Sequence, residues 1–288
     1  MNIGFIGLGN LGLPIAENIL QKRSQLFVYN RTTSKAQPIV ERGAIMCNSI
    51  KELCEKCEVV FTIVSDDAAL NDITLGKDGV AENLRHGGVH VSITTILPAT
   101  ATRLTEKHTE HKNYYVAAPV MGRPEAARAG KLNFLVAGAA TAVDLVKPLL
   151  KDAGGAGVWE FGNVTAAANV AKLCNNFLIV AAIEAMAEGI YLARKSGINA
   201  EAWMNMVTQT LFAAPVYINY GNILLKEIFQ PAGFALKLGL KDVNLVIEQA
   251  RQASAHMPIG ELMQKRLNEC ADNGMGDYDW TAVALTLK

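Results

Sequence analysis

The sequence lacks an excess of charge of either sign. Its 27 basic residues balance 27 acidic residues, so the formal net charge is zero at pH 7. A surface that binds nucleic acid or an anionic membrane carries a positive excess, and the balance removes that argument for the chain as a whole. Small molecules and further subunits remain as the expected partners.

Cysteine is scarce. The five cysteines are an odd number without the density of a disulfide-stabilised scaffold, and they suit a reducing compartment. The first residues also lack a basic stretch followed by an apolar core, so residues 1–7 are interpreted as the first strand of the fold rather than as a signal sequence. Both absences favour a cytoplasmic protein.

Metal and nucleophile motifs are missing as well. Cys54 and Cys57 have C-x-x-C spacing, but no second pair accompanies them. His108 and His111 lie three residues apart on an expected surface helix, without a third ligand nearby in sequence. No serine or cysteine lies in a nucleophile elbow. We expect no metal.

Half of the 288 residues are apolar, so the chain can bury a substantial core. In the first half, short β-branched runs alternate with amphipathic stretches such as residues 13–21 and 34–42. This alternation predicts an α/β class with a Rossmann-type, doubly wound, mostly parallel sheet. The expected strands cover residues 3–6, 25–29, 59–64, 89–93, 114–117, 133–137 and 158–161.

From about residue 164 the periodicity is helical and no strand pattern appears. The expected helices cover residues 164–196, 200–210, 217–227, 235–254 and 259–273. The first is long enough to join two domains, which gives a nucleotide-binding domain over 1–162 and an all-α domain over 163–288. That helix contains a long apolar run interrupted by Glu184 and Glu188, which favours burial between domains or subunits over a membrane span.

Residues 7–12 form a glycine-rich turn, Gly-Leu-Gly-Asn-Leu-Gly, between the first expected strand and a helix. Gly7 would allow a tight turn, Gly9 would let the backbone approach a pyrophosphate, and Gly12 would let the helix pack close to the strand. The helix N-terminus would offer N–H groups to the anion. A purely structural turn without a cofactor is the alternative interpretation.

The end of the second expected strand bears on the choice of cofactor. NAD-binding proteins place an acidic residue near here, on the ribose hydroxyls, but this chain has Asn30. A neutral Asn30 followed by Arg31, Thr32 and Thr33 can bind a 2′-phosphate that a carboxylate would repel. NADPH is therefore favoured over NADH, unless Arg31 is a solvated loop residue.

Four segments in order give the chain a resemblance to the β-hydroxyacid dehydrogenases, a family within the superfamily of 6-phosphogluconate dehydrogenase. They are residues 4–12, the run Ala-Pro-Val-Met-Gly at 118–122, Lys-Leu-Cys-Asn-Asn at 172–176, and Gly-Leu-Lys-Asp at 239–242. The resemblance covers essentially the whole chain. It implies an NAD(P)-dependent enzyme that interconverts a small β-hydroxyacid and its aldehyde or keto acid.

The resemblance assigns the acid–base role to Lys172, the lysine of the family's K-x-x-N-N motif. The residues themselves agree, because Lys172 is a single cation on an apolar stretch, where desolvation lowers a lysine pKa toward the working pH. Asn176 lies four residues later on the same helical face and can hold substrate, together with Asn175. A solvated surface lysine is the alternative.

The resemblance also implies further contacts. Thr95 would lie near the nicotinamide ribose, and Phe234 and Lys241 would line the cofactor and substrate cleft. The expected cofactor-binding residues are Gly7, Gly9, Asn10, Leu11, Gly12, Asn30, Arg31, Thr32, Val64, Thr95, Phe234 and Lys241.

The expected substrate loop departs from the family pattern. The family usually has serine-glycine-glycine where this chain has Met121, Gly122 and Arg123, followed by Pro124. A thioether donates no hydrogen bond, and proline removes one amide. Arg123 can compensate by binding a substrate carboxylate, or it can pair with the nearby Glu125.

Two other functions stay open. One is an imine reductase, a related group that usually has aspartate or tyrosine at the position of Lys172. The other is a non-catalytic NADP-binding protein. The resemblance further implies a homodimer or homotetramer formed through the helical domain, for which the apolar helix over 164–196 is suited.

Overall fold

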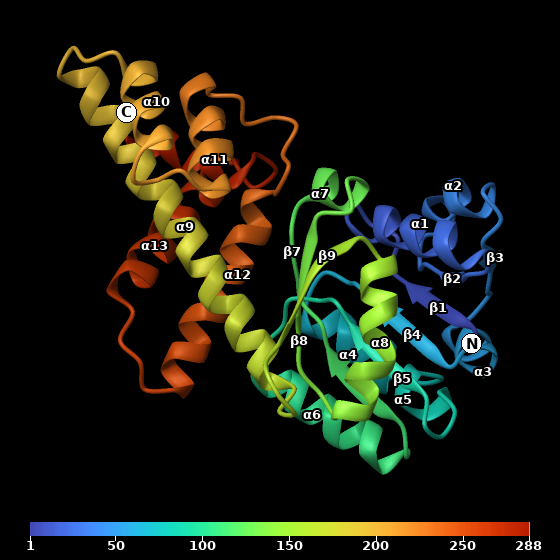
Figure 1. The fold of residues 1–288 in the computed structure, drawn as a ribbon. Helices are drawn as coiled ribbons and strands as arrows, with labels where there is room; N and C mark the ends of the chain where they lie inside the picture. The colour runs from blue at the N-terminus through green and yellow to red at the C-terminus, as the bar shows by residue number, and fades with distance from the viewer. Residues whose placement is uncertain (288) are drawn as a thin grey trace. The chain divides into compact units, whose positions relative to one another are not determined.

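The computed structural model describes residues 1–287 (Figure 1). The chain divides into two compact units, Met1–Lys172 and a second unit from Leu173 onward. The division falls inside a single long helix, α9 (Ala166–Lys195), which begins shortly after the expected boundary at residue 162. Each unit has its own hydrophobic core.

The first unit is built on a six-stranded sheet with the order β3-β2-β1-β4-β5-β6, in which every neighbouring pair is parallel. The strands are β1 (Ile3–Ile6), β2 (Phe27–Tyr29), β3 (Ile45–Met46), β4 (Val59–Thr62), β5 (Val89–Ser92) and β6 (Tyr114–Ala117). The strand order reverses between β1 and β4, which is where a doubly wound sheet binds its ligand. The expected Rossmann-type sheet is confirmed.

Helices cover both faces of this sheet, and their starts follow local sequence signals. Ser49 caps α3 and Asp66 caps α4, each accepting a backbone hydrogen bond from the residue three positions later. The helical segments of the first unit are α1 (Gly12–Arg23), η1 (Thr33–Lys35), α2 (Gln37–Val40), α3 (Ile50–Lys56), α4 (Asp67–Leu75), α5 (Val80–Asn83), α6 (Pro98–Glu110), α7 (Pro124–Arg128) and α8 (Ala140–Asp152).

The last strands of this unit form a separate sheet, which corrects the expectation of a single one. β7 (Val120–Met121) pairs antiparallel with β8 (Leu132–Val136), and β8 pairs parallel with β9 (Gly155–Glu160). Pro119 follows β6 and has no N–H to donate, so the β6 ladder stops there and the chain enters the second sheet. The two sheets stay linked by one bridge between Ala117 and Ala137.

The second unit is helical, as the periodicity predicts. Its segments are the larger part of α9, α10 (Ala200–Gln209), α11 (Pro215–Lys226), α12 (Leu236–Gln252), α13 (Pro258–Asp272) and the 3-10 segment η2 (Trp280–Leu287). Asn199 caps α10, and α11 and α13 each begin with proline, which suits the first helical position. Of the described residues in this unit, only Ala235 and Asp279 form a β-bridge.

Candidate active site

A glycine-rich turn joins β1 to α1, and its three glycines differ in the space around them. Gly7 has φ +101°, and a Cβ on it would lie 2.0 Å from the carbonyl oxygen of Ile63. A Cβ on Gly12 would lie 2.1 Å from the Gly7 oxygen. Gly9 is exposed, with no atom within 4 Å of its Cβ position. The outer glycines therefore permit close backbone packing, whereas Gly9 leaves room for a ligand.

The N-terminus of α1 is open to an anion. The described chain provides no side-chain cap for this helix, and its first turn contains no acidic residue. Asn10 is exposed and Leu11 is half-buried just before the helix begins. Because the first N–H groups of a helix are unpaired and carry partial positive charge, a pyrophosphate fits this cradle.

Asn30, at the end of β2, ties the glycine-rich turn to the neighbouring strand. Its Oδ1 accepts a hydrogen bond from the Leu8 N–H at 2.8 Å, and its Nδ2 donates to the Thr32 carbonyl at 2.7 Å. A carboxylate here would have no donor for that carbonyl. The amide thus shapes the turn and the segment that carries Arg31, a role that the sequence did not reveal.

A cavity of about 330 Å³ opens beside the end of β2. Its lining is Tyr29, Asn30, Arg31, Thr33, Ala36, Gln37, Val40, Met46, Cys47 and Asn48. This described lining contains one guanidinium and no carboxylate, and Arg31, Thr32 and Thr33 are exposed. The cavity is therefore electrostatically suited to an anionic group.

Two hydrogen bonds join the loops that follow β4 and β5. The Val64 N–H donates to Thr94 Oγ1 at 3.0 Å, and the Leu97 N–H donates to Asp67 Oδ1 at 3.0 Å. Val64 and Thr95 lie half-buried in these loops, at the carboxyl ends of adjacent strands beside the reversal of strand order. Thr94 and Asp67 fix the loops, and neither was among the expected site residues.

The expected substrate loop spans β7 and the start of α7. Gly122 has φ +139°, and a Cβ on it would lie 2.5 Å from Leu132 Cδ2. Met121 ends β7 and is half-buried, as is Arg123, which directly precedes α7. Pro124 occupies the first helical position, where an amide would have no partner within the helix, so the loop loses little by having proline there.

Lys172 lies in the second turn of α9 and is 9% exposed. Asn169 and Asn176, which lie three and four residues away on the same helical face, are 2% and 5% exposed. Asn175 is half-buried. The expectation that Lys172 is buried rather than solvated is confirmed, and two amide side chains share its face.

Within the helical unit, Asp242 connects the motif at residues 172–176 with the motif at residues 239–242. Its Oδ2 accepts a hydrogen bond from Asn176 Nδ2 at 2.7 Å, and its Oδ1 lies 2.9 Å from Lys241 Nζ. Asp242 is 4% exposed. It therefore orients the Asn176 amide and holds Lys241. From the sequence alone, Asp242 is only the last residue of the Gly-Leu-Lys-Asp motif.

The segment around Phe234 is held by the start of η2. The Phe234 ring packs edge-on against Trp280, with 4.9 Å between ring centroids, and the Gly233 and Phe234 N–H groups both donate to Asp279 Oδ2 at 3.2 Å. Gly239 lies close to the same indole, since a Cβ on it would be 2.7 Å from Trp280. The tryptophan therefore links Phe234 to α12, which also carries Lys241.

The other side chains singled out from the sequence have structural roles. Cys54 and Cys57 are buried, and no cluster of three metal-ligating side chains occurs within residues 1–287. His108 is buried on the inner face of α6 and His111 is exposed, while other residues of α6 are exposed, as expected for a surface helix. Glu184 forms a buried ion pair with Arg266 of α13 at 2.8 Å, so it contacts a neighbouring helix as expected.

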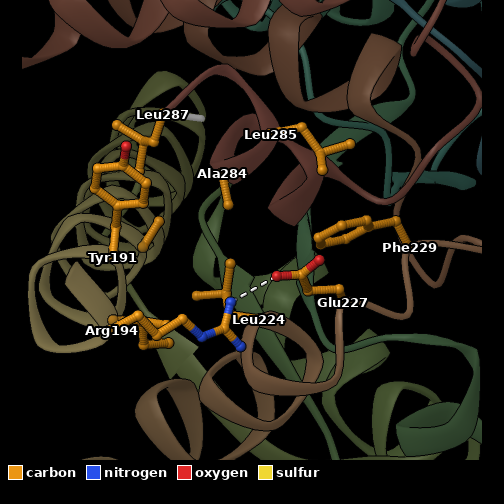
Figure 2. Close-up of a pocket in the computed structure, with 10 residues that line it drawn as sticks. Tyr191, Arg194, Leu224, Glu227, Phe229, Ala284, Leu285 and Leu287 are labelled. Carbon is orange, nitrogen blue, oxygen red and sulfur yellow. Dashed lines mark hydrogen bonds and ion pairs between the residues drawn. The ribbon is translucent and has the colours of Figure 1, made fainter. Parts of the chain in front are cut away.

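The helical unit also encloses a small cavity between α9, α11 and the end of the chain (Figure 2). An ion pair of 2.6 Å between Arg194 and Glu227 lies at one side, and apolar side chains such as Phe229 and Leu285 line the rest. Its volume is about 20 Å³, enough for roughly one water molecule. The cavity is a packing feature and is too small for a substrate.

A parallel sheet with a glycine cradle at its strand reversal, followed by a long helix that carries a buried lysine motif and leads into a helical unit, defines an NAD(P)-dependent oxidoreductase. Residues 2–171 match the family model described as the NAD binding domain of 6-phosphogluconate dehydrogenase. Residues 166–287 match the model described as NAD-binding of NADP-dependent 3-hydroxyisobutyrate dehydrogenase. Together the two matches span nearly the whole chain.

The chain is also similar in sequence and in fold to individual known proteins. The chain is 38% identical to the uncharacterized oxidoreductase YfjR of Bacillus subtilis, over all of both chains. It is 30% identical to the chloroplastic glyoxylate/succinic semialdehyde reductase 2 of Arabidopsis thaliana, over all of this chain and 80% of that protein. A solved structure, Psf3 in complex with NADP+ and 2-OPP, has the same fold, with a TM-score of 0.89, 24% identity, and 99% and 100% of the two chains covered.

The chain belongs to the β-hydroxyacid dehydrogenase family, within which 3-hydroxyisobutyrate dehydrogenases and glyoxylate/succinic semialdehyde reductases are found.

Proposed function

We propose that this protein is an NADPH-dependent reductase that interconverts a short aldehyde or keto acid and its β-hydroxyacid, with Lys172 as the general acid and base. The observation that carries the proposal is the 9% exposure of Lys172 on a helical face shared with Asn169 and Asn176. A lysine side chain that lies beside two amide side chains and away from bulk water can exchange a proton with a bound substrate, which is the role that the family resemblance gives to the lysine of this motif.

NADPH is proposed over NADH because of the chemistry at the end of β2. Asn30 is neutral and is engaged with backbone groups, so it presents no charge to a ribose. Arg31 supplies a guanidinium to the adjoining cavity, and Thr32 and Thr33 supply exposed hydroxyls. These donors suit the dianionic 2′-phosphate that distinguishes NADPH from NADH.

The proposed substrate carries a carboxylate and is small. Support comes from Arg123, a half-buried guanidinium next to the amides of the substrate loop, and from a relative named for glyoxylate and succinic semialdehyde. Met121 replaces a hydroxyl that the family usually offers, so we assign carboxylate binding to Arg123 and the loop amides.

When bound, the nicotinamide supplies the hydride that reduces the substrate carbonyl carbon. Lys172 then donates the proton from Nζ to the carbonyl oxygen, which gives the alcohol, and it accepts that proton in the reverse direction. Asn176, oriented by Asp242, holds the substrate oxygen through its amide. The cradle around Gly9 and the N-terminus of α1 would hold the pyrophosphate.

A spectrophotometric screen tests the proposal. Purified protein is assayed for NADPH oxidation with glyoxylate, succinic semialdehyde, methylmalonate semialdehyde, tartronate semialdehyde and a cyclic imine. We expect turnover with at least one oxo acid and none with the imine. Turnover with the imine alone would instead support an imine reductase, and binding of NADPH without turnover would support a non-catalytic protein.

We also propose that a second copy of the chain covers the exposed face of α9. An 18-residue window of this helix has a mean hydropathy of 1.5, and 39% of that window is buried inside the chain. Leu178, Ala185 and Leu192, spaced seven residues apart on one face, are exposed, the two leucines by 65% and 67%. Light scattering should show an oligomer that Leu178→Lys dissociates and that Leu145→Lys, an exposed leucine of α8, leaves intact.

A further inference from the structure

Four buried polar side chains form a continuous hydrogen-bonded chain beside the parallel sheet, here termed the histidine relay. Thr62 Oγ1 lies 2.8 Å from His90 Nε2. His90 Nδ1 lies 2.9 Å from His108 Nε2, and His108 Nδ1 lies 2.5 Å from Asn113 Oδ1. The four residues are between 0% and 3% exposed.

The direction of the relay is fixed from its far end. Asn113 Nδ2 donates to the carbonyls of Ala81 and Leu84, both at 3.0 Å, so Asn113 Oδ1 must be the atom that faces His108. A neutral His108 therefore donates from Nδ1 and accepts at Nε2, and His90 in turn donates from Nδ1. His90 Nε2 is left to accept from the Thr62 hydroxyl, so every polar atom along the relay has a partner.

The relay connects the interior of the first unit to the backbone segment that packs against the glycine-rich turn. Its end residue, Thr62, is the last residue of β4, and its carbonyl accepts from the Ile93 N–H at 2.8 Å. The next residue, Ile63, provides the carbonyl that lies under Gly7 and the Cγ2 that lies 2.8 Å from a Cβ on Gly12. A shift of Thr62 would therefore displace the backbone on which the glycine turn rests.

The surroundings keep both imidazoles neutral. Burial lowers the pKa of His90 well below its usual value, and the facing His108 lowers it further. Burial also lowers the pKa of His108 to about 4, opposed by its hydrogen bond to Asn113, and His111, which directly follows α6, adds to the decrease. From β6, the Tyr115 ring lies 5.3 Å and 5.7 Å from the two imidazole centroids, and burial raises the pKa of its hydroxyl.

We propose that the histidine relay is a positioning device for the dinucleotide: it holds the carboxyl end of β4 in the one orientation that leaves the glycine cradle open. The inference rests on the nucleotide-binding part of the proposed function and not on the substrate or on Lys172. Thr62, His90, His108 and Asn113 are positioning residues, because they act through Ile63 and the turn.

The test compares two isosteric substitutions. Thr62→Val removes the relay's terminal hydroxyl and leaves His90 Nε2 without a donor. Thr74→Val removes a hydroxyl that is equally buried, at 1% exposure, and that has no hydrogen-bond partner within residues 1–287. Dissociation constants for NADPH and NADH are measured by titration in the absence of substrate. We expect Thr62→Val to weaken both nucleotides by about five- to tenfold, as loss of a buried hydrogen bond implies.

Two further measurements separate positioning from plain stability. Thr62→Ser restores the hydroxyl and should restore nucleotide affinity, and Thr74→Val should leave it unchanged. Nitrogen-15 NMR of the histidines at neutral pH should show both buried rings neutral and protonated at Nδ1. Unchanged nucleotide affinity in Thr62→Val, or a buried ring protonated at Nε2, overturns the relay alone. A wild-type protein that binds neither nucleotide overturns the relay and the proposed function together.

Discussion

At the scale of single residues, the site depends on side chains that hold others in place. The oxygen and the nitrogen of the Asn30 side-chain amide each form a hydrogen bond with a backbone group, and Asp242 contacts Asn176 and Lys241. Neither role can be deduced from sequence, because each depends on one partner that is distant along the chain, Leu8 for Asn30 and Asn176 for Asp242. The sequence singles out Arg31 and Lys172, since a charged residue in a motif is visible without its surroundings, and the roles of both residues stay predictions.

Arg31 carries the prediction about cofactor choice. Arg31→Ala should raise the KM for NADPH by about 10- to 100-fold, because a charge-assisted contact to a phosphate contributes roughly 1.5–3 kcal/mol. The KM for NADH should change little, since NADH has no 2′-phosphate. Steady-state kinetics with both nucleotides check this, with Lys35→Ala, an exposed residue in the following 3-10 turn, as the comparison. Equal losses for both nucleotides would contradict the assignment.

At the scale of elements, the strands and helices with strong periodic signals were predictable and the shortest ones were not. The sequence predicted β1 and β6 with their observed bounds and all of α9 to α13 closely. It missed β3 and β7, which are two residues long and carry no readable alternation. It also missed that β8 and β9 form their own sheet, because sheet membership depends on pairing between distant segments.

In the strand–turn–helix element at the start of the chain, substitutions at two glycines should distinguish an effect on packing from an effect on ligand binding. Gly12→Ala would push a methyl group against the Gly7 carbonyl at 2.1 Å, so both thermal stability and nucleotide affinity should fall. Gly9→Ala meets open space and should keep the melting temperature while weakening the nucleotide by at least about tenfold, because its methyl group would occupy the pyrophosphate's approach. Calorimetry gives the melting temperature of both variants, and nucleotide titration gives their affinities. Full affinity in Gly9→Ala would rule out the cradle as the binding site.

At the scale of the whole molecule, the buried histidines of the first unit and Glu184 of the helical unit should give opposite dependences of stability on pH between about pH 4.5 and 6.5. In the first unit, the buried imidazoles have pKa values below their unfolded value of about 6.5, and that of His108 is about 4. The unfolded chain therefore takes up protons first on acidification. This unit should be fully stable above pH 6.5 and should lose stability as the pH falls toward 4.

Burial raises the pKa of Glu184 in the helical unit from 4.5 to about 7, despite Arg266. A carboxyl that binds its proton more tightly when folded contributes stability below pH 4.5, and that contribution is lost as the pH rises toward 7. Hydrogen exchange, corrected for intrinsic rates, resolves the two units. Glu184→Gln should reduce the change of unfolding free energy with pH in the helical unit alone. His86→Gln, which changes an exposed histidine, should leave the pH dependence of both units as it is. An unfolding free energy that changes with pH in the same direction in both units would contradict this expectation.

The ammonium of Lys172 is the proposed proton donor of a nicotinamide-dependent reduction. The most direct measurement compares turnover and NADPH affinity in Lys172→Ala with those in Lys195→Ala, which removes an exposed lysine at the other end of the same helix. We expect Lys172→Ala to lower kcat by about 10²- to 10⁴-fold with nucleotide affinity nearly unchanged, and Lys195→Ala to change neither. Turnover near the wild-type rate in Lys172→Ala would contradict this role.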